Sequence, residues 1–135
     1  MAAGSLERLN SSINNSSTIV EVAGANIPGP AHKAVMYDAN GNIVVATSGK
    51  NAIGTVLSSS LDPIVAGRQV HIAIKNIVLM EAGGAVAKGD KVTVNATGQA
   101  VTAVTDDFIF GRAFEAADEA GQVIQVQINQ MGFMA

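Results

Sequence analysis

The sequence predicts an all-β fold, a small β-barrel or β-sandwich assembled from short hairpins. Apolar residues occur in short β-branched runs, turn signals separate these runs at close spacing, and no long stretch has the 3.6-residue periodicity of a helix. The chain has 135 residues, of which 48% are apolar, so it can bury one core without metal or disulfide crosslinks. Trp is absent and aromatics make up 4%, so aliphatic side chains must fill that core.

The N-terminal residues 1–31 differ in composition from the rest of the chain. Ser and Asn dominate residues 10–17, and Gly and Pro recur between residues 24 and 30. Such polar tracts bury too little apolar surface to order by themselves. We therefore predict an extended polar arm over residues 1–31, either without fixed structure or ordered on a partner, and a single β-rich domain over residues 32–135. Within the arm, Thr18–Val22 has the composition of a strand.

The first hairpin is predicted where two apolar runs, Ala34–Tyr37 and Asn42–Thr47, flank Asp38-Ala39-Asn40-Gly41. The Asn-Gly pair in that turn is typical of tight hairpins, because it readily accepts positive φ. A third run, Ala52–Leu57, leads into Ser58–Pro63, whose hydroxyls and proline indicate a surface loop.

Alternation with a period of two extends from Gln69 to Met80 and predicts a half-buried strand. Asn76 interrupts its apolar face, and a bulge at Lys75-Asn76 would explain the interruption. We expect this strand either to be shared between two sheets or to lie at a subunit contact. The apolar face comprises Val70, Ile72, Ile74, Val78 and Met80, opposite Gln69, His71 and Lys75.

Two more hairpins are predicted after Gly83-Gly84. The first joins Lys91–Val94 to Gln99–Val104, and the second joins Phe108–Glu115 to Gln122–Asn129. In the last strand, alternation predicts Ile124, Val126 and Ile128 inward and Gln125, Gln127 and Asn129 outward. Short helices are possible at Ala85–Ala87 or within Glu115–Glu119, and no repeat of fixed period indicates a solenoid.

Candidate chemical sites are few. Without Cys there are no disulfides, thiolate metal sites or cysteine nucleophiles, and neither His32 nor His71 has acidic residues at metal-ligand spacing. No nucleophile or phosphate-binding signature occurs. We therefore predict no catalytic, cofactor-binding or metal-binding residues, and no enzymatic activity. One acidic group that could bind a hard cation is interpreted as two solvated turns: Asp106, Asp107, Glu115, Asp118 and Glu119.

The charge pattern argues against nucleic acid as a partner. Eight basic and eleven acidic residues give a net charge of −3, and the basic residues are scattered along the chain. Residues 1–10 lack the apolar core of a secretory leader, and no apolar run approaches the roughly 20 residues of a membrane-spanning helix. We expect a protein that is made in the cytoplasm, stays soluble and has no membrane partner.

The order of features from Gly83 to Asn129 resembles the capsid decoration proteins of tailed bacteriophages, also called head-stabilising or cement proteins. A Lys-Gly-Asp-Lys-Val turn enters a strand, a Thr-Gly hairpin follows, and Phe110-Gly111-Arg112-Ala113 begins the next strand. An Ala-Gly loop at Ala120-Gly121 then leads into the closing Val/Ile strand.

The resemblance implies a β-tulip-like fold and a structural role without a cofactor. Members of that family bind the outer surface of the expanded capsid, usually as homotrimers, and bridge major capsid protein subunits. The resemblance therefore implies a virion protein, synthesised in the host cytoplasm, whose partners are the major capsid protein and itself. The polar arm would lie along capsid subunits or a neighbouring protomer.

Two alternatives remain open. A trimeric β adhesin or receptor-binding module on a virion surface would expose aromatics at one end, and the single Tyr37 with no Trp argues against it. A lipoyl or biotinyl carrier domain would modify a lysine on a hairpin tip. Lys88 lies before a Gly-Asp turn without the acidic or Met neighbours of such carriers, so we interpret it as a turn lysine.

Overall fold

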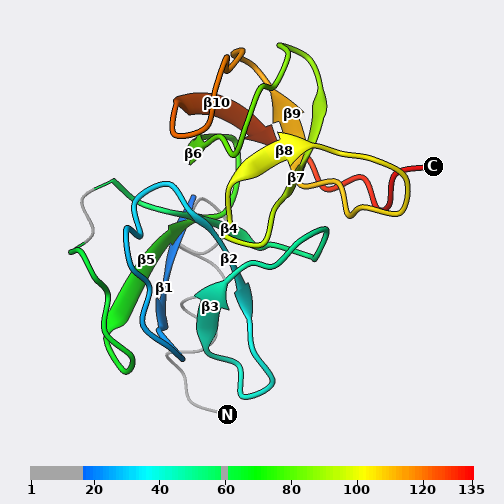
Figure 1. The fold of residues 1–135 in the computed structure, drawn as a ribbon. Coiled ribbons are helices and arrows are strands. Elements are labelled where there is room, and N and C mark those ends of the chain that lie inside the picture. Colours follow the sequence, from blue (N-terminus) through cyan, green and yellow to red (C-terminus); the bar gives the residue numbers. More distant parts are fainter. Residues whose placement is uncertain (1–16, 59–60) are drawn as a thin grey trace.

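The computed structural model describes residues 17–58 and 61–135, which form two five-stranded antiparallel sheets (Figure 1). The all-β prediction is confirmed, and this part of the chain contains no helix. The two sheets form a sandwich-like arrangement rather than a closed barrel. The strands are β1 (Thr18–Val22), β2 (Ala34–Tyr37), β3 (Ile43–Val45), β4 (Gly54–Val56), β5 (Gln69–Ala73), β6 (Ile77–Glu81), β7 (Lys91–Val94), β8 (Ala100–Thr102), β9 (Gly111–Ala113) and β10 (Val123–Ile128).

The first sheet has the strand order β1-β5-β4-β2-β3. Its β2–β3 hairpin forms as predicted, because Gly41 takes a φ of 79° and Asp38 Oδ1 accepts hydrogen bonds from the N–H groups of Asn40 and Asn42, each at 2.9 Å. Aliphatic side chains alone fill its core, as the composition predicts: Ala23, Ile27, Val35, Ile43, Val56, Ile64, Val70 and Ile72.

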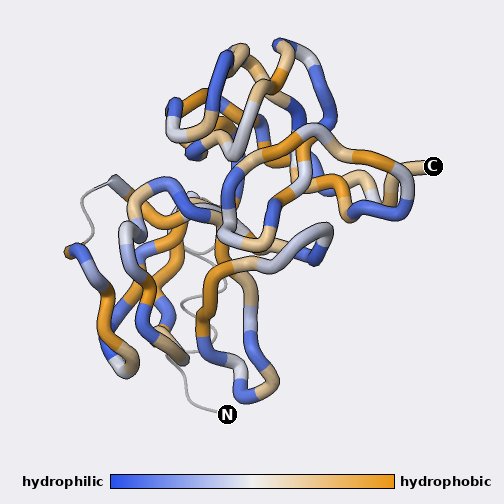
Figure 2. The backbone as a smooth tube through the Cα atoms, viewed as in Figure 1, coloured by the Kyte–Doolittle hydropathy of each residue, from blue (hydrophilic) through white to orange (hydrophobic). Residues whose placement is uncertain are grey.

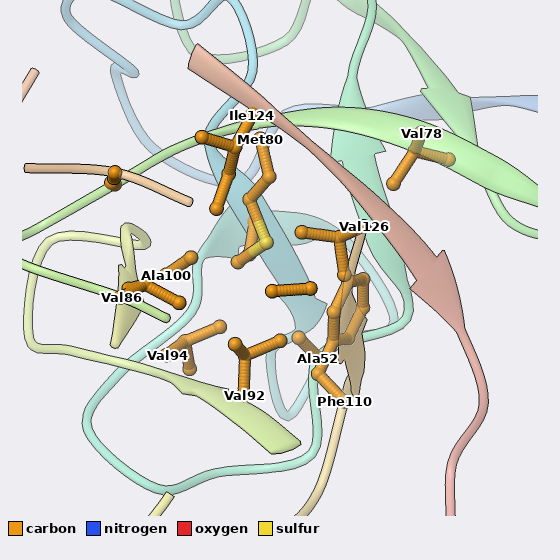
Figure 3. Close-up of a cluster of buried hydrophobic side chains, with 14 of the residues drawn as sticks. Ala52, Val78, Met80, Val86, Val92, Val94, Ala100, Phe110, Ile124 and Val126 are labelled. Atoms are coloured by element: carbon orange, nitrogen blue, oxygen red, sulfur yellow. The ribbon is translucent and has the colours of Figure 1, made fainter. Parts of the chain in front are cut away.

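The second sheet has the order β6-β10-β9-β7-β8 and contains both C-terminal hairpins that the sequence predicts. Its core centres on Phe110 and Met80, which Figure 3 shows pointing into one cluster with Val92 and Val126. Hydrophobic segments run along the strands of both sheets, and hydrophilic segments gather in the outer loops (Figure 2).

The two sheets are copies of one topology. We call residues 17–75 the first half and residues 76–135 the second half. When strands are counted from the start of each half, both sheets read first, fifth, fourth, second, third. The isolated bridges also correspond, since Ala23↔Ile43 and Ala82↔Ala100 are both parallel and join the edge strands of each sheet at one end. The antiparallel bridges Ile27↔Ile64 and Val86↔Ala117 match in the same way.

The correspondence extends to single hydrogen bonds. Asn95 Oδ1 accepts from the N–H groups of Thr97 and Gln99 in the β7–β8 turn, as Asp38 does in the β2–β3 turn. A Cβ on Gly54 would lie 2.1 Å from the carbonyl oxygen of Ala73, and one on Gly111 would lie 2.0 Å from that of Gln127. This internal repeat is not evident from the sequence, because few of the equivalent residues are identical.

The two halves pack against each other, with one side of the first half lying on the core of the second half. Ala34, Ala46 and Ala52 of the first half are fully buried within the core of the second half. The backbone joins the halves here too, since the N–H of Ala34 donates to Gly98 O at 2.7 Å and that of Gly49 donates to Val94 O at 2.9 Å. One side of the first half is therefore an interface within the chain.

Two expectations need correction. Gln69–Met80 is not one bulged strand but two, β5 and β6, which belong to different sheets, and Asn76 makes the break by taking a φ of 67°. The run therefore contributes to both sheets, but as two separate strands and not as the single shared strand that was expected. Neither possible short helix forms, because Val86 and Ala117 hydrogen-bond each other as extended chain.

The predicted arm, residues 1–31, lies partly outside the described residues, which begin at Ser17. Within it, Thr18–Val22 forms β1 as predicted and pairs with β5 along its full length. Ala23 and Ile27, which follow, are buried in the first core. The ordering of residues 1–16 on a partner stays a prediction.

Candidate binding surfaces

The residues considered for metal binding do not come together. His71 is exposed on the outer face of β5, and His32 lies in a turn with a φ of 65°, where its carbonyl accepts the N–H of Glu81. Across residues 17–58 and 61–135, no group of three or more His, Asp or Glu side chains could hold a metal ion.

The acidic group belongs to two separate turns. Asp107 Oδ2 accepts the N–H of Val104 at 2.9 Å, and Asp106 donates its own N–H to the C-terminal segment at Met134 O. Glu115 Oε1 accepts the N–H of Gln125 at 2.9 Å. These carboxylates and backbone groups order local turns.

Lys88 does not occupy a hairpin tip. It is exposed in the connection between β6 and β7, immediately before Gly89, which takes a φ of 93° and donates its N–H to Ala113 O. This position is unlike the hairpin tip that carries the modified lysine in carrier domains.

A groove of about 700 Å³ lies on the outer side of the first sheet. Leu57, Leu61, Val65 and His71 contribute to its lining, and Leu61 is 77% exposed. Leu57 also lines a second depression of about 330 Å³ between the sheets, which β6 borders with Ile77 and Leu79. The exposed apolar surface thus continues from one half to the other.

The outer face of the second sheet carries a row of four side chains in register. Lys91 pairs with Arg112, Arg112 with Gln127, and Gln127 with Ile77, so the row crosses β7, β9, β10 and β6. Directly paired residues point to the same face of a sheet. The row therefore changes from two cations, through an amide, to an aliphatic side chain that is 52% exposed.

A third surface lies at the C-terminal segment. Phe133 is 70% exposed and packs edge-to-face on Phe108, with ring centroids 5.7 Å apart. Met131 in the same segment and Val104 in the loop after β8 are also exposed. Hydrogen bonds between Ile109 and Gly132 and between Asp107 and Met134 hold the C-terminal segment in place.

The sequence located part of these surfaces. The outward orientation of Gln125, Gln127 and Asn129 is confirmed, as is the inward orientation of Ile124 and Val126. The basic row was missed, because Lys91 and Arg112 become neighbours only through the register of β7 with β9.

The model of the phage cement protein family matches residues 60–128 of the chain. The fold is similar to the solved structure of the N base of the head fiber protein gp8.5 of bacteriophage phi29, with a TM-score of 0.66. That alignment has 21% sequence identity and covers 87% of this chain and 98% of the phi29 chain, so it supports the fold. No curated protein matches the sequence.

Proposed function

Because the chain belongs to the phage cement protein family, and is thus a capsid-associated structural protein, we propose that it binds the outer surface of the expanded capsid and bridges neighbouring major capsid protein subunits. In this proposal the protein is a virion component without enzymatic activity, which is made in the host cytoplasm and acts as a homotrimer.

The observation that carries the proposal is the exposed aliphatic surface on a small, rigid β scaffold. Soluble monomers rarely expose large contiguous apolar patches, so such patches indicate contact surfaces. Here the exposed residues lie on edge strands and loops of both halves, for example Val20 on β1, Leu79 on β6 and Leu61 in the loop before β5. A protein with contact surfaces on both halves is suited to touch more than one neighbour.

Stabilisation of the capsid by this route requires only additional contact area between the protein and the capsid subunits. A standard protein interface buries about 1,600 Å². When such a contact repeats over a shell, modest single contacts sum to a large stabilisation, and a trimer that engages several subunits gains from effective concentration. Paired backbones hold the contact residues on strands, such as Val20 and Leu79, in fixed positions, so little ordering entropy opposes binding through them.

The test mixes purified protein with expanded heads that lack it and pellets the heads. Saturable co-pelleting at a fixed number of copies per head, with a higher temperature of head disruption, is the expected result. Light scattering after gel filtration measures the oligomer, and a mass three times that of the chain supports the trimer. Absence of co-pelleting at high protein concentration would contradict capsid binding and would favour the adhesin alternative, for which binding to host cells is the corresponding assay.

A further inference from the structure

We propose that the outer face of the second sheet around Lys91 and Arg112 docks onto an acidic, carboxylate-bearing surface of the capsid shell. This inference rests on the proposed function and adds the binding face and the chemistry of its partner.

The first observation is a pair of like charges. Lys91 and Arg112 stand directly opposite each other on β7 and β9. Like charges in that arrangement destabilise a sheet. Arg112 Nη1 donates to Gly89 O at 3.1 Å, which fixes the guanidinium beside the turn that also carries exposed Lys88. Two cations therefore lie side by side on this face, next to the turn that carries Lys88, in a protein whose net charge is −3.

The second observation is the lack of carboxylate partners on this face. Within residues 17–58 and 61–135, the salt bridge that forms is the one between Lys33 and Glu81. The nearest acidic residue in sequence, Asp90, instead accepts hydrogen bonds from the N–H of Ala87 and the hydroxyl of Thr102. The positive charge of Lys88, Lys91 and Arg112 is therefore available to an external group.

The third observation comes from the internal repeat. Ala34 and Thr55, paired in register on β2 and β4, are the equivalents of Lys91 and Arg112, and they are 0% and 1% exposed. In the first half this face is an interface, because the second half covers it. In the second half the corresponding face is covered less completely. Thr93 on this face is 2% exposed, but Lys91 and Arg112 are only half-buried.

In the second half, long cations stand where the first half has small residues, and this difference limits what can bind to the face. Ala34 admits the close approach of Gly98, with Ala34 N–H donating to Gly98 O at 2.7 Å. Lys91 at the equivalent position prevents another half from packing equally closely, which argues against continued stacking of copies on this face. Complementary charge then favours an acidic partner, and Ile77 and Leu79 at the far end of the face add apolar contact.

The experiment measures binding to expanded heads as a function of salt for the full chain and for two single variants with the same change in charge. Lys91→Glu reverses a charge on the proposed face, and Lys50→Glu reverses an exposed charge in the loop between β3 and β4. We expect Lys91→Glu to weaken binding about tenfold at low salt and to reduce the salt dependence, and Lys50→Glu to change the affinity less than about twofold. Arg112→Gln, which removes charge without reversing it, should lie between wild type and Lys91→Glu.

Each other outcome contradicts the inference. In one such outcome the wild type binds and Lys91→Glu and Lys50→Glu weaken binding equally, and in another neither variant weakens it. Either result would show that this face is not the binding face, although capsid binding itself would stand. Failure of the wild type to bind would reject the proposed function and this inference together. Binding of a short DNA duplex with the affinity shown for heads, lost in Lys91→Glu, would identify a nucleic-acid partner instead. Circular dichroism and thermal melting establish that each variant is folded.

Discussion

Lys33 Nζ lies 2.7 Å from Glu81 Oε2, and this ion pair joins the residue that precedes β2 in the first sheet to the last residue of β6 in the second. Gln99 Nε2 donates to the same carboxylate oxygen at 2.6 Å, and the N–H of Glu81 donates to His32 O. The two halves are thus tied by a partly buried polar cluster beside their alanine-rich apolar contact.

The first prediction concerns acid stability. Burial works to raise the pKa of Glu81, but hydrogen bonds from Lys33 and Gln99 and the charges of Lys33 and His32 together hold that pKa below its usual value of 4.5. A carboxyl with a depressed pKa stabilises the fold fully above its unfolded-state value, and this contribution is lost as pH falls through the folded-state pKa.

Glu81→Gln should therefore lower the free energy of unfolding at pH 7 by about 1 kcal/mol, or roughly 4 °C in Tm. The difference from wild type should shrink as the pH is lowered below 4.5. Thermal melting followed by circular dichroism from pH 7 to pH 3 measures both. Glu119→Gln, at an exposed position, is the control and should melt with the wild type. A difference that is independent of pH would show that the charge of Glu81 is not the cause.

The second prediction uses the single tyrosine. The Tyr37 hydroxyl donates a hydrogen bond to Glu21 Oε2. This hydrogen bond, then burial and the negative charge of Glu21, raise the pKa of Tyr37 above its usual value of 10.0. Because the chain has one Tyr and no Trp, ultraviolet absorbance reports this ionisation directly.

Glu21→Gln should shift the titration midpoint of Tyr37 to lower pH, since it removes the carboxylate charge that opposes formation of the phenolate. Glu115→Gln, on the second half, should leave the midpoint unchanged. Equal midpoints in wild type and Glu21→Gln would argue against the contact between β1 and β2.

The sequence predicts those parts of the fold that neighbouring residues determine, and does not predict those that depend on contacts between residues far apart in the chain. The β2–β3 hairpin was predictable because Gly41 and the Asp38 side chain determine the turn within a few residues. The separation of β5 from β6 was not, because the apolar alternation resumes in the same phase after Asn76 and only contacts with β4 and β10 assign the two strands to different sheets.

The binding surfaces show the same limit. Period-two alternation placed Gln125 and Gln127 on an outer face, since facing is a local property of a strand. It could not place Arg112 beside Lys91, which are far apart in sequence and meet through strand register. The internal repeat is not evident from the sequence for a related reason: the halves share backbone geometry, as at Gly54 and Gly111, more than side-chain identity.

The third prediction tests the repeat through those two glycines. A Cβ at either position would collide with a carbonyl oxygen of the neighbouring strand, at 2.1 Å for Gly54 and 2.0 Å for Gly111. Backbone cannot yield as a flexible side chain can, so Gly54→Ala and Gly111→Ala should each cost about 2 to 4 kcal/mol of unfolding free energy. Chemical denaturation measures both values.

Gly84→Ala is the matched control, because a Cβ there meets no atom within 4 Å and should change stability by less than about 0.5 kcal/mol. Similar losses at Gly54 and Gly111 would support equivalent roles in the two halves. A tolerated alanine at either position would show that the close strand approach at that site is wrong.

The fourth prediction concerns the segment before β1. β1 pairs with β5 over its whole length, so a deletion that tests the arm must end before Thr18. Removing residues 2–16 should leave the melting temperature of the domain close to that of wild type but lower its occupancy on expanded heads, if the polar segment orders on the shell. Removing residues 2–25 is the informative contrast: it takes away β1 and buried Ala23 and should strongly destabilise the first sheet. If the variant that lacks residues 2–16 occupies heads as fully as the wild type, capsid binding depends on the two sheets alone. If the variant that lacks residues 2–16 fails to fold, those residues belong to the domain.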